Sequence, residues 1–247
     1  MDEQSRLALV TGGAGALGAV TGEFLARRGN VTYLLDADGD RAAAAAGKLA
    51  EQGLSVQARA LDVTDATAAA TLMDSLSEQY GGIDVLVNMA GVVRNASLAK
   101  ISEADFNLTI RTHVNGTLNC MQAVAASMRR RKYGRVINIS SVAALGTVGG
   151  GAYGAAKGAI ESLSRAAAIE WAPHGITVNC VAPGLIAAGM FLRVPEEYQK
   201  DGIERTPMKR AGTAEEVADA ITFFASPGAS FVTGQTLFVC GGLSVGF

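Results

Sequence analysis

Short apolar runs alternate with helix-forming segments along the whole chain, and this alternation constrains the fold more than any other feature. The expected strands are residues 6–10, 31–35, 55–60, 84–87, 135–139, 175–181 and 236–239. One expected helix runs from the glycine-rich turn to about residue 28, and a second, alanine-rich helix starts near residue 39. The others cover residues 65–80, 102–130, 153–171 and 213–225. Strands that alternate regularly with helices predict a parallel sheet covered on both faces. We therefore expect one α/β domain over residues 1–247, built on a doubly wound parallel sheet.

The composition excludes several classes of protein. The 247 residues are 49% hydrophobic and 18% charged, with a formal net charge of -2, which argues against disorder and against a general nucleic-acid binder. No apolar run approaches the ~18 residues of a membrane span, and the acidic start of the chain is unlike a signal peptide. The three cysteines are widely spaced and the two histidines are isolated, so we expect no metal site and a cytoplasmic protein.

A glycine-rich turn, Thr11–Gly18, joins the first expected strand to the first expected helix. Its candidate ligand-binding residues are Gly12, Gly15, Ala16, Leu17 and Gly18. A strand, a glycine turn and a helix together present backbone N–H groups to a phosphate. The alternative is a tight connection that binds nothing. In context, the turn predicts a Rossmann-type dinucleotide site.

Asp36 ends the second expected strand, where such a site grips the adenosine ribose hydroxyls. Asp38 and Asp40 follow, and Arg41 is the only basic residue nearby. A cofactor 2′-phosphate would therefore meet three carboxylates, which favours NAD over NADP. Asp38 and Asp40 also suit the start of the next helix, where acidic residues favour the helix dipole.

Tyr153 and Lys157 lie four residues apart on an expected helix, so their side chains share one face. A phenol titrates near pH 10, and a lysine cation one turn away would lower that pKa. Ser140 and Ser141 end a buried strand, where a hydroxyl could hold a substrate oxygen while Tyr153 transfers a proton. A surface tyrosine and a solvated lysine are the alternative for this spacing alone.

The singled-out residues converge on one edge of the predicted sheet. Gly12, Asp36, Asp62, Asn88 and Ser141 each follow or end a strand. Ligands of such sheets bind beyond the carboxyl ends of the strands. The convergence therefore predicts a single site.

With these motifs in order, the chain resembles the short-chain dehydrogenase/reductase family over essentially its whole length. The motifs are Thr11–Gly18, Asp62-Val63, Asn88-Met89-Ala90-Gly91, a serine before Tyr153 and Lys157, and Asn179-Cys180-Val181-Ala182-Pro183-Gly184. The resemblance implies that Tyr153 is the general acid/base, that Lys157 assists it and binds the nicotinamide ribose, and that the serine polarises the substrate oxygen. It implies cofactor contacts from Asp62, Val63, Asn88, Ala90, Gly91, Pro183, Gly184 and Ile186.

The sequence departs from the family pattern at several positions. Alanine stands at position 16 where glycine is usual, Met89 replaces a common second asparagine, and Ala188 stands where a threonine often meets the cofactor. The strand end favours Ser141 as the active serine, whereas counting back from the tyrosine favours Ser140.

His113 occupies the place of the family's active-site asparagine. The family asparagine holds a water that links the lysine to solvent. A histidine could do the same while titrating near neutrality, and a structural histidine outside the relay is the alternative.

The resemblance implies an NAD-dependent oxidoreductase that interconverts a secondary alcohol and a ketone. Its substrate is expected to be either a free hydroxy or keto compound or a 3-hydroxyacyl or 3-oxoacyl thioester. Residues 184–208 should cover the substrate, and their apolar side chains favour an apolar one. The family also implies a homotetramer. A dinucleotide-binding regulator or scaffold without turnover is the alternative function.

Overall fold

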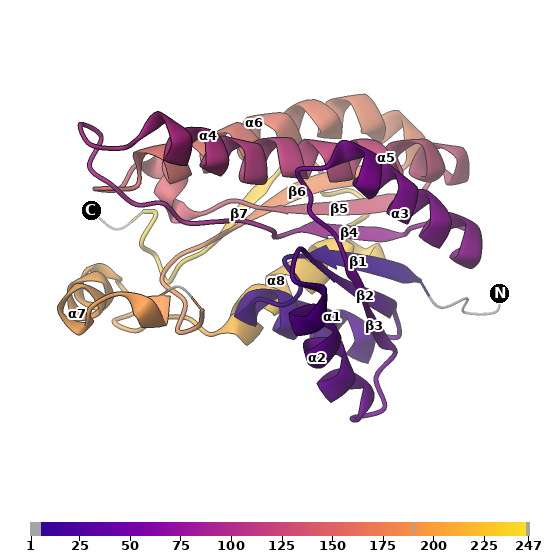
Figure 1. The fold of residues 1–247 in the computed structure, drawn as a ribbon, viewed down its shortest axis with the longest axis horizontal. Helices are drawn as coiled ribbons and strands as arrows, with labels where there is room; N and C mark the ends of the chain where they lie inside the picture. The colour runs from indigo at the N-terminus through magenta and orange to yellow at the C-terminus, as the bar shows by residue number, and fades with distance from the viewer. Residues whose placement is uncertain (1–5, 190, 246–247) are drawn as a thin grey trace.

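The computed structural model describes residues 6–189 and 191–245, apart from the side chain of Arg193, and contains one seven-stranded parallel sheet (Figure 1). The strand order is β3-β2-β1-β4-β5-β6-β7. The strands are β1 Leu7–Thr11, β2 Val31–Asp36, β3 Val56–Ala60, β4 Val85–Asn88, β5 Gly134–Ile139, β6 Ile176–Pro183 and β7 Thr236–Val239. The order reverses between β1 and β4, so the sheet is doubly wound, as the sequence predicted.

Helices cover both faces of this sheet (Figure 1). One face carries α1 Ala16–Arg27, α2 Gly39–Ala50 and α8 Ala214–Ala225. The other carries α3 Ala66–Tyr80, α4 Glu103–Ile110, α5 Gly116–Arg131 and α6 Gly151–Trp171. Side chains alternate between the faces along a strand. Leu7 and Leu9 of β1 accordingly pack into one hydrophobic core, and Ala8 and Val10 pack into the other.

Side-chain caps start several helices where the sequence predicted them. The carboxylates of Asp38 and Asp65 accept the N–H groups of Arg41 and Ala68 at the starts of α2 and α3. Thr213 forms the predicted capping box with Glu216 at the start of α8. These caps fix where the helices begin relative to the strand ends.

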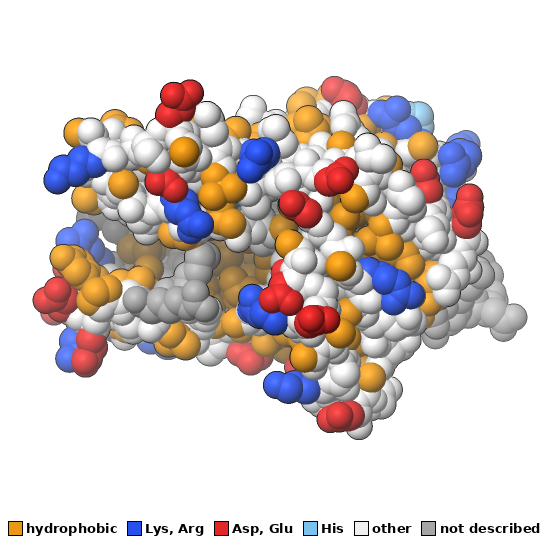
Figure 2. Space-filling model, in the orientation of Figure 1, with side chains coloured by type: hydrophobic (Ala, Val, Ile, Leu, Met, Phe, Trp, Pro, Cys, Tyr) orange, Lys and Arg blue, Asp and Glu red, His pale blue; other side chains and the backbone are white. Residues whose placement is uncertain are grey.

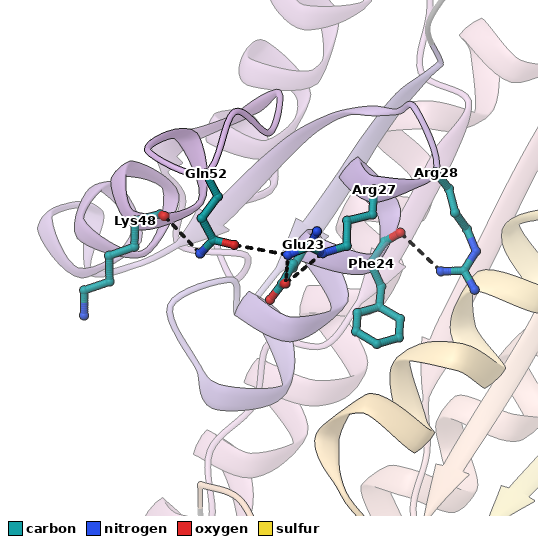
Figure 3. Close-up of polar contacts among 6 residues, drawn as sticks. All are labelled: Glu23, Phe24, Arg27, Arg28, Lys48 and Gln52. Carbon is teal, nitrogen blue, oxygen red and sulfur yellow. Dashed lines mark hydrogen bonds and ion pairs between the residues drawn. The ribbon is translucent and has the colours of Figure 1, made fainter.

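Polar contacts join the outer ends of α1 and α2 (Figure 3). The Arg27 guanidinium donates to Glu23 one turn earlier and to Gln52 beyond the end of α2. These side chains are solvent-exposed, and exposed ion pairs contribute only ~0–1 kcal/mol. The buried residues of α1, rather than these contacts, hold its N-terminus at the sheet edge.

The helix expected to run from Ser102 to about residue 130 is irregular around His113, the position where the family resemblance implies a kink in the helix. A π-helical segment, Arg111–Asn115, separates α4 from α5 and contains His113. A π turn inserts a residue into the helical repeat and is common at functional sites. Directly after it, Gly116 packs against Val63 with no room for a side chain.

Residues 184–208 form the expected loop with short helices. A 3₁₀ turn, Phe191–Arg193, precedes the helix α7, Glu196–Arg205. The structure describes every residue of α7, and none of them is buried. Met190, one of the apolar residues expected here, lies outside the described residues. Among the described residues, no helix is long and apolar enough to cross a membrane. The same residues contain no cluster of three or more metal-ligating side chains.

Candidate active site

A cavity of about 460 Å³ opens at the carboxyl edge of the sheet, a size typical of small-ligand sites. It brings together most of the predicted site residues. These are Gly12, Gly15, Ala16, Leu17, Gly18, Asp36, Gly91, His113, Ser141, Tyr153, Lys157, Pro183, Gly184 and Ile186. Residues far apart in the sequence thus line one site.

The glycine turn forms a cradle at the start of α1. Gly15 is the N-cap, no described side chain caps it, and the first turn of α1 carries no acidic residue. The first N–H groups of the helix can therefore bind an anion. Gly12 has a φ of 68°, and a Cβ at Gly18 would overlap the Gly12 carbonyl oxygen. These residues fit the diphosphate of a dinucleotide, because the backbone can approach the anion closely.

The Asp36 carboxylate lies at the end of β2 beside this cradle. Its two oxygens accept the backbone N–H groups of Ala14 and Asp38, both at 3.1 Å. Arg41 also lines the cavity, and its guanidinium donates to the Ala14 carbonyl at 3.3 Å. The carboxylate is therefore held in place by backbone donors, while Asp38 only caps α2.

Four of the predicted cofactor-binding residues are not among the described residues that line the cavity. Asp62 accepts the N–H of Thr64, which is ordinary turn chemistry, and Val63 belongs to the core. The buried Asn88 amide donates to Asn138 at 2.8 Å, and the N–H of Ala90 donates to the Thr11 hydroxyl. In this structure these four residues shape the strand ends beside the site.

Lys157 is almost wholly buried below the cavity. Its ammonium donates to the carbonyl of Ile139 at 2.7 Å and lies 5.3 Å from the centre of the Tyr153 ring. Burial lowers the pKa of Lys157 to about 8, because a charged group loses its hydration inside the protein. The bond to Ile139, the last residue of β5, fixes the ammonium next to the phenol.

The hydroxyl of Tyr153 is partnered by Ser141. Burial raises the pKa of Tyr153 above its ordinary value, and the hydrogen bond from Ser141 partly offsets that rise. The lowered pKa expected for this phenol is therefore not found, because burial raises the pKa by more than the hydrogen bond from Ser141 lowers it. A raised pKa keeps the phenol protonated at neutral pH, ready to donate.

The two adjacent serines point to different partners. Both serines line the cavity, and the Oγ of Ser141 accepts the N–H of Ala143. Ser140 is 1% exposed, and its hydroxyl donates to the carboxylate of Glu161 at 2.7 Å. The geometry favours Ser141 as the serine that meets a substrate.

His113 is buried at the back of the cavity. Its ring meets the Tyr153 ring edge to face, with centroids 5.3 Å apart, and its Nε2 lies 2.7 Å from the carbonyl oxygen of Val92. Burial, with a smaller effect of the Lys157 charge, lowers the pKa of His113 to about 3. The expectation that His113 titrates near neutrality is therefore wrong, and the ring is neutral at physiological pH.

Gly91 explains how this ring is accommodated. A Cβ at Gly91 would overlap the imidazole, so the glycine leaves the space that the ring fills. The Nδ1 atom of His113 has no hydrogen-bond partner among the described residues. Sequence reasoning missed this packing, and it also missed Leu185 and Gly189 in the cavity wall. Leu185 could have been found from its place directly after Pro183-Gly184.

A doubly wound sheet with a phosphate cradle, a ribose-binding carboxylate and a tyrosine–lysine pair defines a dinucleotide-dependent oxidoreductase. A family model described as enoyl-(acyl carrier protein) reductase matches residues 12–244. The (2S)-[(R)-hydroxy(phenyl)methyl]succinyl-CoA dehydrogenase subunit BbsD of Thauera aromatica is 38% identical over 245 residues, with 99% of each chain covered. The 3-oxoacyl-[acyl-carrier-protein] reductase FabG of Escherichia coli (strain K12) is 33% identical over 246 residues, covering 98% of this chain and 99% of its own.

A solved structure agrees with these sequence relatives. The gluconate 5-dehydrogenase from Burkholderia cenocepacia J2315, in complex with NADP and tartrate, superposes with a TM-score of 0.92. It is 34% identical and covers 97% of this chain and 95% of its own. The chain belongs to the short-chain dehydrogenase/reductase family. It is a nicotinamide-dependent oxidoreductase of the alcohol dehydrogenase and ketoreductase type, and the regulatory alternative does not hold.

Proposed function

We propose that this protein uses NAD to interconvert a secondary alcohol and a ketone at the cavity, with Tyr153 as the general acid/base. One observation carries the proposal. Ser141, Tyr153 and Lys157 open into the same cavity as the glycine cradle and Asp36. Proton-transfer groups and dinucleotide-binding groups therefore share one site, as hydride transfer requires.

The bound nicotinamide supplies or accepts the hydride, and the protein's residues handle the substrate oxygen. In ketone reduction, Ser141 and Tyr153 donate hydrogen bonds to that oxygen, and Tyr153 delivers the proton. The Lys157 ammonium, 5.3 Å from the ring centre, stabilises the phenolate that remains. In alcohol oxidation the phenolate takes the proton back.

His113 is proposed to act in this site as a neutral group. With Nε2 at the Val92 carbonyl, the ring holds the loop after β4, and its edge-to-face contact fixes the Tyr153 ring. Its unpartnered Nδ1 can accept a hydrogen bond from a water. As a neutral ring, His113 can hold the water that links Lys157 to solvent. It cannot take up a proton at neutral pH.

The preference for NAD rests on Asp36. Its carboxylate is held by two backbone N–H groups at the place where the adenosine ribose would lie. A 2′-phosphate there would meet a fixed negative charge, although Arg41 lies in the same wall. The gluconate 5-dehydrogenase was solved with NADP, so the choice needs a direct test. We expect NAD to give the higher kcat/KM, and equal efficiency with NADP would contradict the assignment.

A 3-hydroxyacyl or 3-oxoacyl thioester is the substrate class that we favour. The names of two relatives specify substrates of this kind, one on coenzyme A and one on an acyl carrier protein. The third specifies gluconate, a polar free hydroxy acid. The apolar loop over the site, which includes Phe191 and Leu185 in the cavity wall, suits an acyl group better than a sugar acid.

Assembly and location complete the proposal. The exposed residues of α6 include Gly151, Ala155, Ser162 and Ala166, which are small enough to allow close packing, and the family resemblance implies that α5 and α6 pair between subunits. We propose a homotetramer, in keeping with closed symmetry, that works in the cytoplasm on a small-molecule substrate and binds neither nucleic acid nor membrane.

NADH formation tests the function as a whole. Purified protein with NAD would be offered 3-hydroxybutyryl-CoA, gluconate and a set of simple secondary alcohols, with NADH followed by its absorbance. We expect turnover of the thioester well above that of gluconate. Turnover of gluconate alone would replace the proposed substrate class, and no turnover of any alcohol, with bound NADH still detectable by fluorescence, would refute the proposed reaction.

A further inference from the structure

Glu161 is a mostly buried carboxylate on α6 that lies outside the catalytic groups. Its side chain is 14% exposed, and one oxygen, Oε1, accepts the hydroxyl of Ser140 at 2.7 Å. The other oxygen lies 3.7 Å from the guanidinium of Arg165, which is half exposed and therefore contributes little. Folded proteins rarely bury a carboxylate unless a partner holds it. Among the described residues, the hydroxyl of Ser140 is thus the main partner of Glu161.

The first half of α6 has little side-chain bulk to hold it in place. Apart from Tyr153 and Lys157, residues 151–159 are all glycine or alanine, and no side chain of the described residues caps the helix at Gly150. Tyr153 and Lys157 face the cavity, and Figure 2 shows that the surface is hollowed at the end of the molecule where α7 lies. Small side chains bury little apolar surface, so this half of the helix needs other attachments.

The end of β5 attaches α6 at two points. The amide of Asn138 donates to the hydroxyl of Ser164 at 2.8 Å, and both residues are buried. Ser140, two residues after Asn138, makes the second bond, to Glu161. Asn138 and Ser140 point to the same side of the strand, and Glu161 and Ser164 share one face of the helix. Two attachment points fix the helix both along its axis and in rotation, whereas one would leave it free to turn about that point.

The attachment at Glu161 is the one next to the catalytic side chains. Glu161 lies one turn after Lys157 and two turns after Tyr153. The carbonyl of Ile139, directly before Ser140, accepts the Lys157 ammonium at 2.7 Å. Neighbouring residues of the strand thus bind neighbouring turns of the helix. A displacement of Glu161 would therefore also displace the two catalytic side chains.

We propose that Glu161 is a positioning residue. By accepting the Ser140 hydroxyl, its carboxylate fixes α6 against the end of β5 and holds Lys157 and Tyr153 where proton transfer needs them. This inference rests on the proposed function, since it takes Tyr153 as the general acid/base. Glu161 is not among the described residues that line the cavity, so it acts through the helix rather than on the substrate. The hydrogen bond carries the effect, and an amide oxygen can accept the same bond.

The expected effect on kcat follows from the displacement of the reacting groups. A misplacement of about 1 Å costs roughly 10²-fold in rate. The bond between Asn138 and Ser164 remains when Glu161 is replaced, so we expect α6 to shift by about a third of that distance and kcat to fall roughly fivefold. The affinity for NADH should change little, because the glycine cradle and Asp36 lie on other elements.

The test compares Glu161→Leu, which removes the acceptor, with Glu161→Gln, which keeps it. The measurements are kcat with the best substrate, NADH affinity by fluorescence titration, and amide hydrogen exchange along α6. Glu161→Leu should lower kcat roughly fivefold and speed exchange over residues 151–160, with NADH affinity near that of the wild type. Glu161→Gln should restore both kcat and exchange. In Glu161→Leu the Ser140 hydroxyl can still donate to the Lys157 carbonyl, 3.3 Å away, so we expect the variant to fold.

Two further variants separate positioning from a general loss of stability. Ile160→Val, at a 2% exposed position on the same helix, weakens packing without touching the bond, so thermal stability should fall while kcat stays at the wild-type value. In a Ser140→Ala background the bond is already absent. Glu161→Leu should then cause no further loss of kcat.

Each outcome supports or overturns a separate statement. A wild-type kcat in Glu161→Leu would overturn the inference, and so would a loss in Glu161→Gln as large as that in Glu161→Leu, because the bond would then not be the cause. An equal loss of kcat in Ile160→Val would show that kcat follows stability and would also overturn it. No turnover by the wild type would refute the proposed reaction. In that case hydrogen exchange still decides whether Glu161 fixes α6, and unchanged exchange in Glu161→Leu would overturn that attachment.

Discussion

Burying Lys157 should cost the protein stability in a way that depends on pH. The pKa of this lysine falls from the ordinary 10.5 to about 8 in the folded protein because its side chain is buried. Between these two values the unfolded chain holds the proton and the folded protein has released it. Stability therefore rises with pH across this window for this group. Lys157→Met removes the titration, so the stability of the wild type relative to the variant should rise from pH 7 to pH 10.

The size of this change follows from the two pKa values. Linkage between pH 7 and pH 10 gives a relative change of about 2.5 kcal/mol in the free energy of unfolding. The raised pKa values of Tyr33 and Cys120, at about 12, are common to both proteins and cancel. The Cys180 thiol interacts with Lys157, but its pKa of about 11 lies above the range measured.

Urea unfolding at both pH values measures the change, and Lys48→Met is the matched control. The Lys48 side chain on α2 is exposed and points away from its neighbours, and its only drawn contact is through its backbone carbonyl (Figure 3). The control should show a stability difference that stays constant from pH 7 to pH 10. A constant difference for Lys157→Met as well would refute the burial argument, and a difference of opposite sign would show that the buried lysine is stabilised by an interaction we have not identified.

The remaining predictions concern the site and the assembly. Gly91→Ala should lower kcat/KM by at least ~10-fold, because the added Cβ would displace the His113 ring. The loss should be smaller in a His113→Asn background, and equal losses in both backgrounds would show that this packing does not matter for catalysis. The pH–rate profile from pH 6 to pH 9 should contain no step that His113→Asn abolishes, since the pKa of His113 is about 3. Ser141→Ala should lower kcat by ~10²-fold while Ser140→Ala mainly lowers thermal stability, and the reverse pattern would reassign the serine. Light scattering at micromolar concentration should give the mass of four chains, and a monomer would contradict the proposed tetramer.

The fold and most of the cavity followed from local features of the sequence. The apolar runs predict the alternation of strands and helices, and short capping patterns predict the helix starts at Asp38 and Thr213. Asp36 was predictable because strand ends of a parallel sheet meet at one edge, so the position of one residue after a strand locates it at the site. These inferences need only neighbours in the chain.

Properties that depend on three-dimensional packing could not be predicted in the same way. No local residue pattern within Arg111–Asn115 predicts its π-helical geometry. The space for the His113 ring is left by Gly91, which lies elsewhere in the chain. Spacing suggested that Lys157 would lower the pKa of Tyr153, but the degree of burial decides the sign and is a tertiary property. Asn88 likewise matched a family motif, yet its amide is used by Asn138 on the neighbouring strand.

The central claim is that Tyr153 transfers the proton at a nicotinamide-binding site, and Tyr153→Phe tests it most directly. The substitution keeps the ring that packs against His113 and removes only the hydroxyl that Ser141 partners. NADH binding would be followed by fluorescence titration, and turnover with the best substrate by NADH absorbance. We predict NADH affinity near that of the wild type and a loss of kcat of at least ~10²-fold. Turnover within a few fold of the wild type, with NADH still bound, would contradict the account.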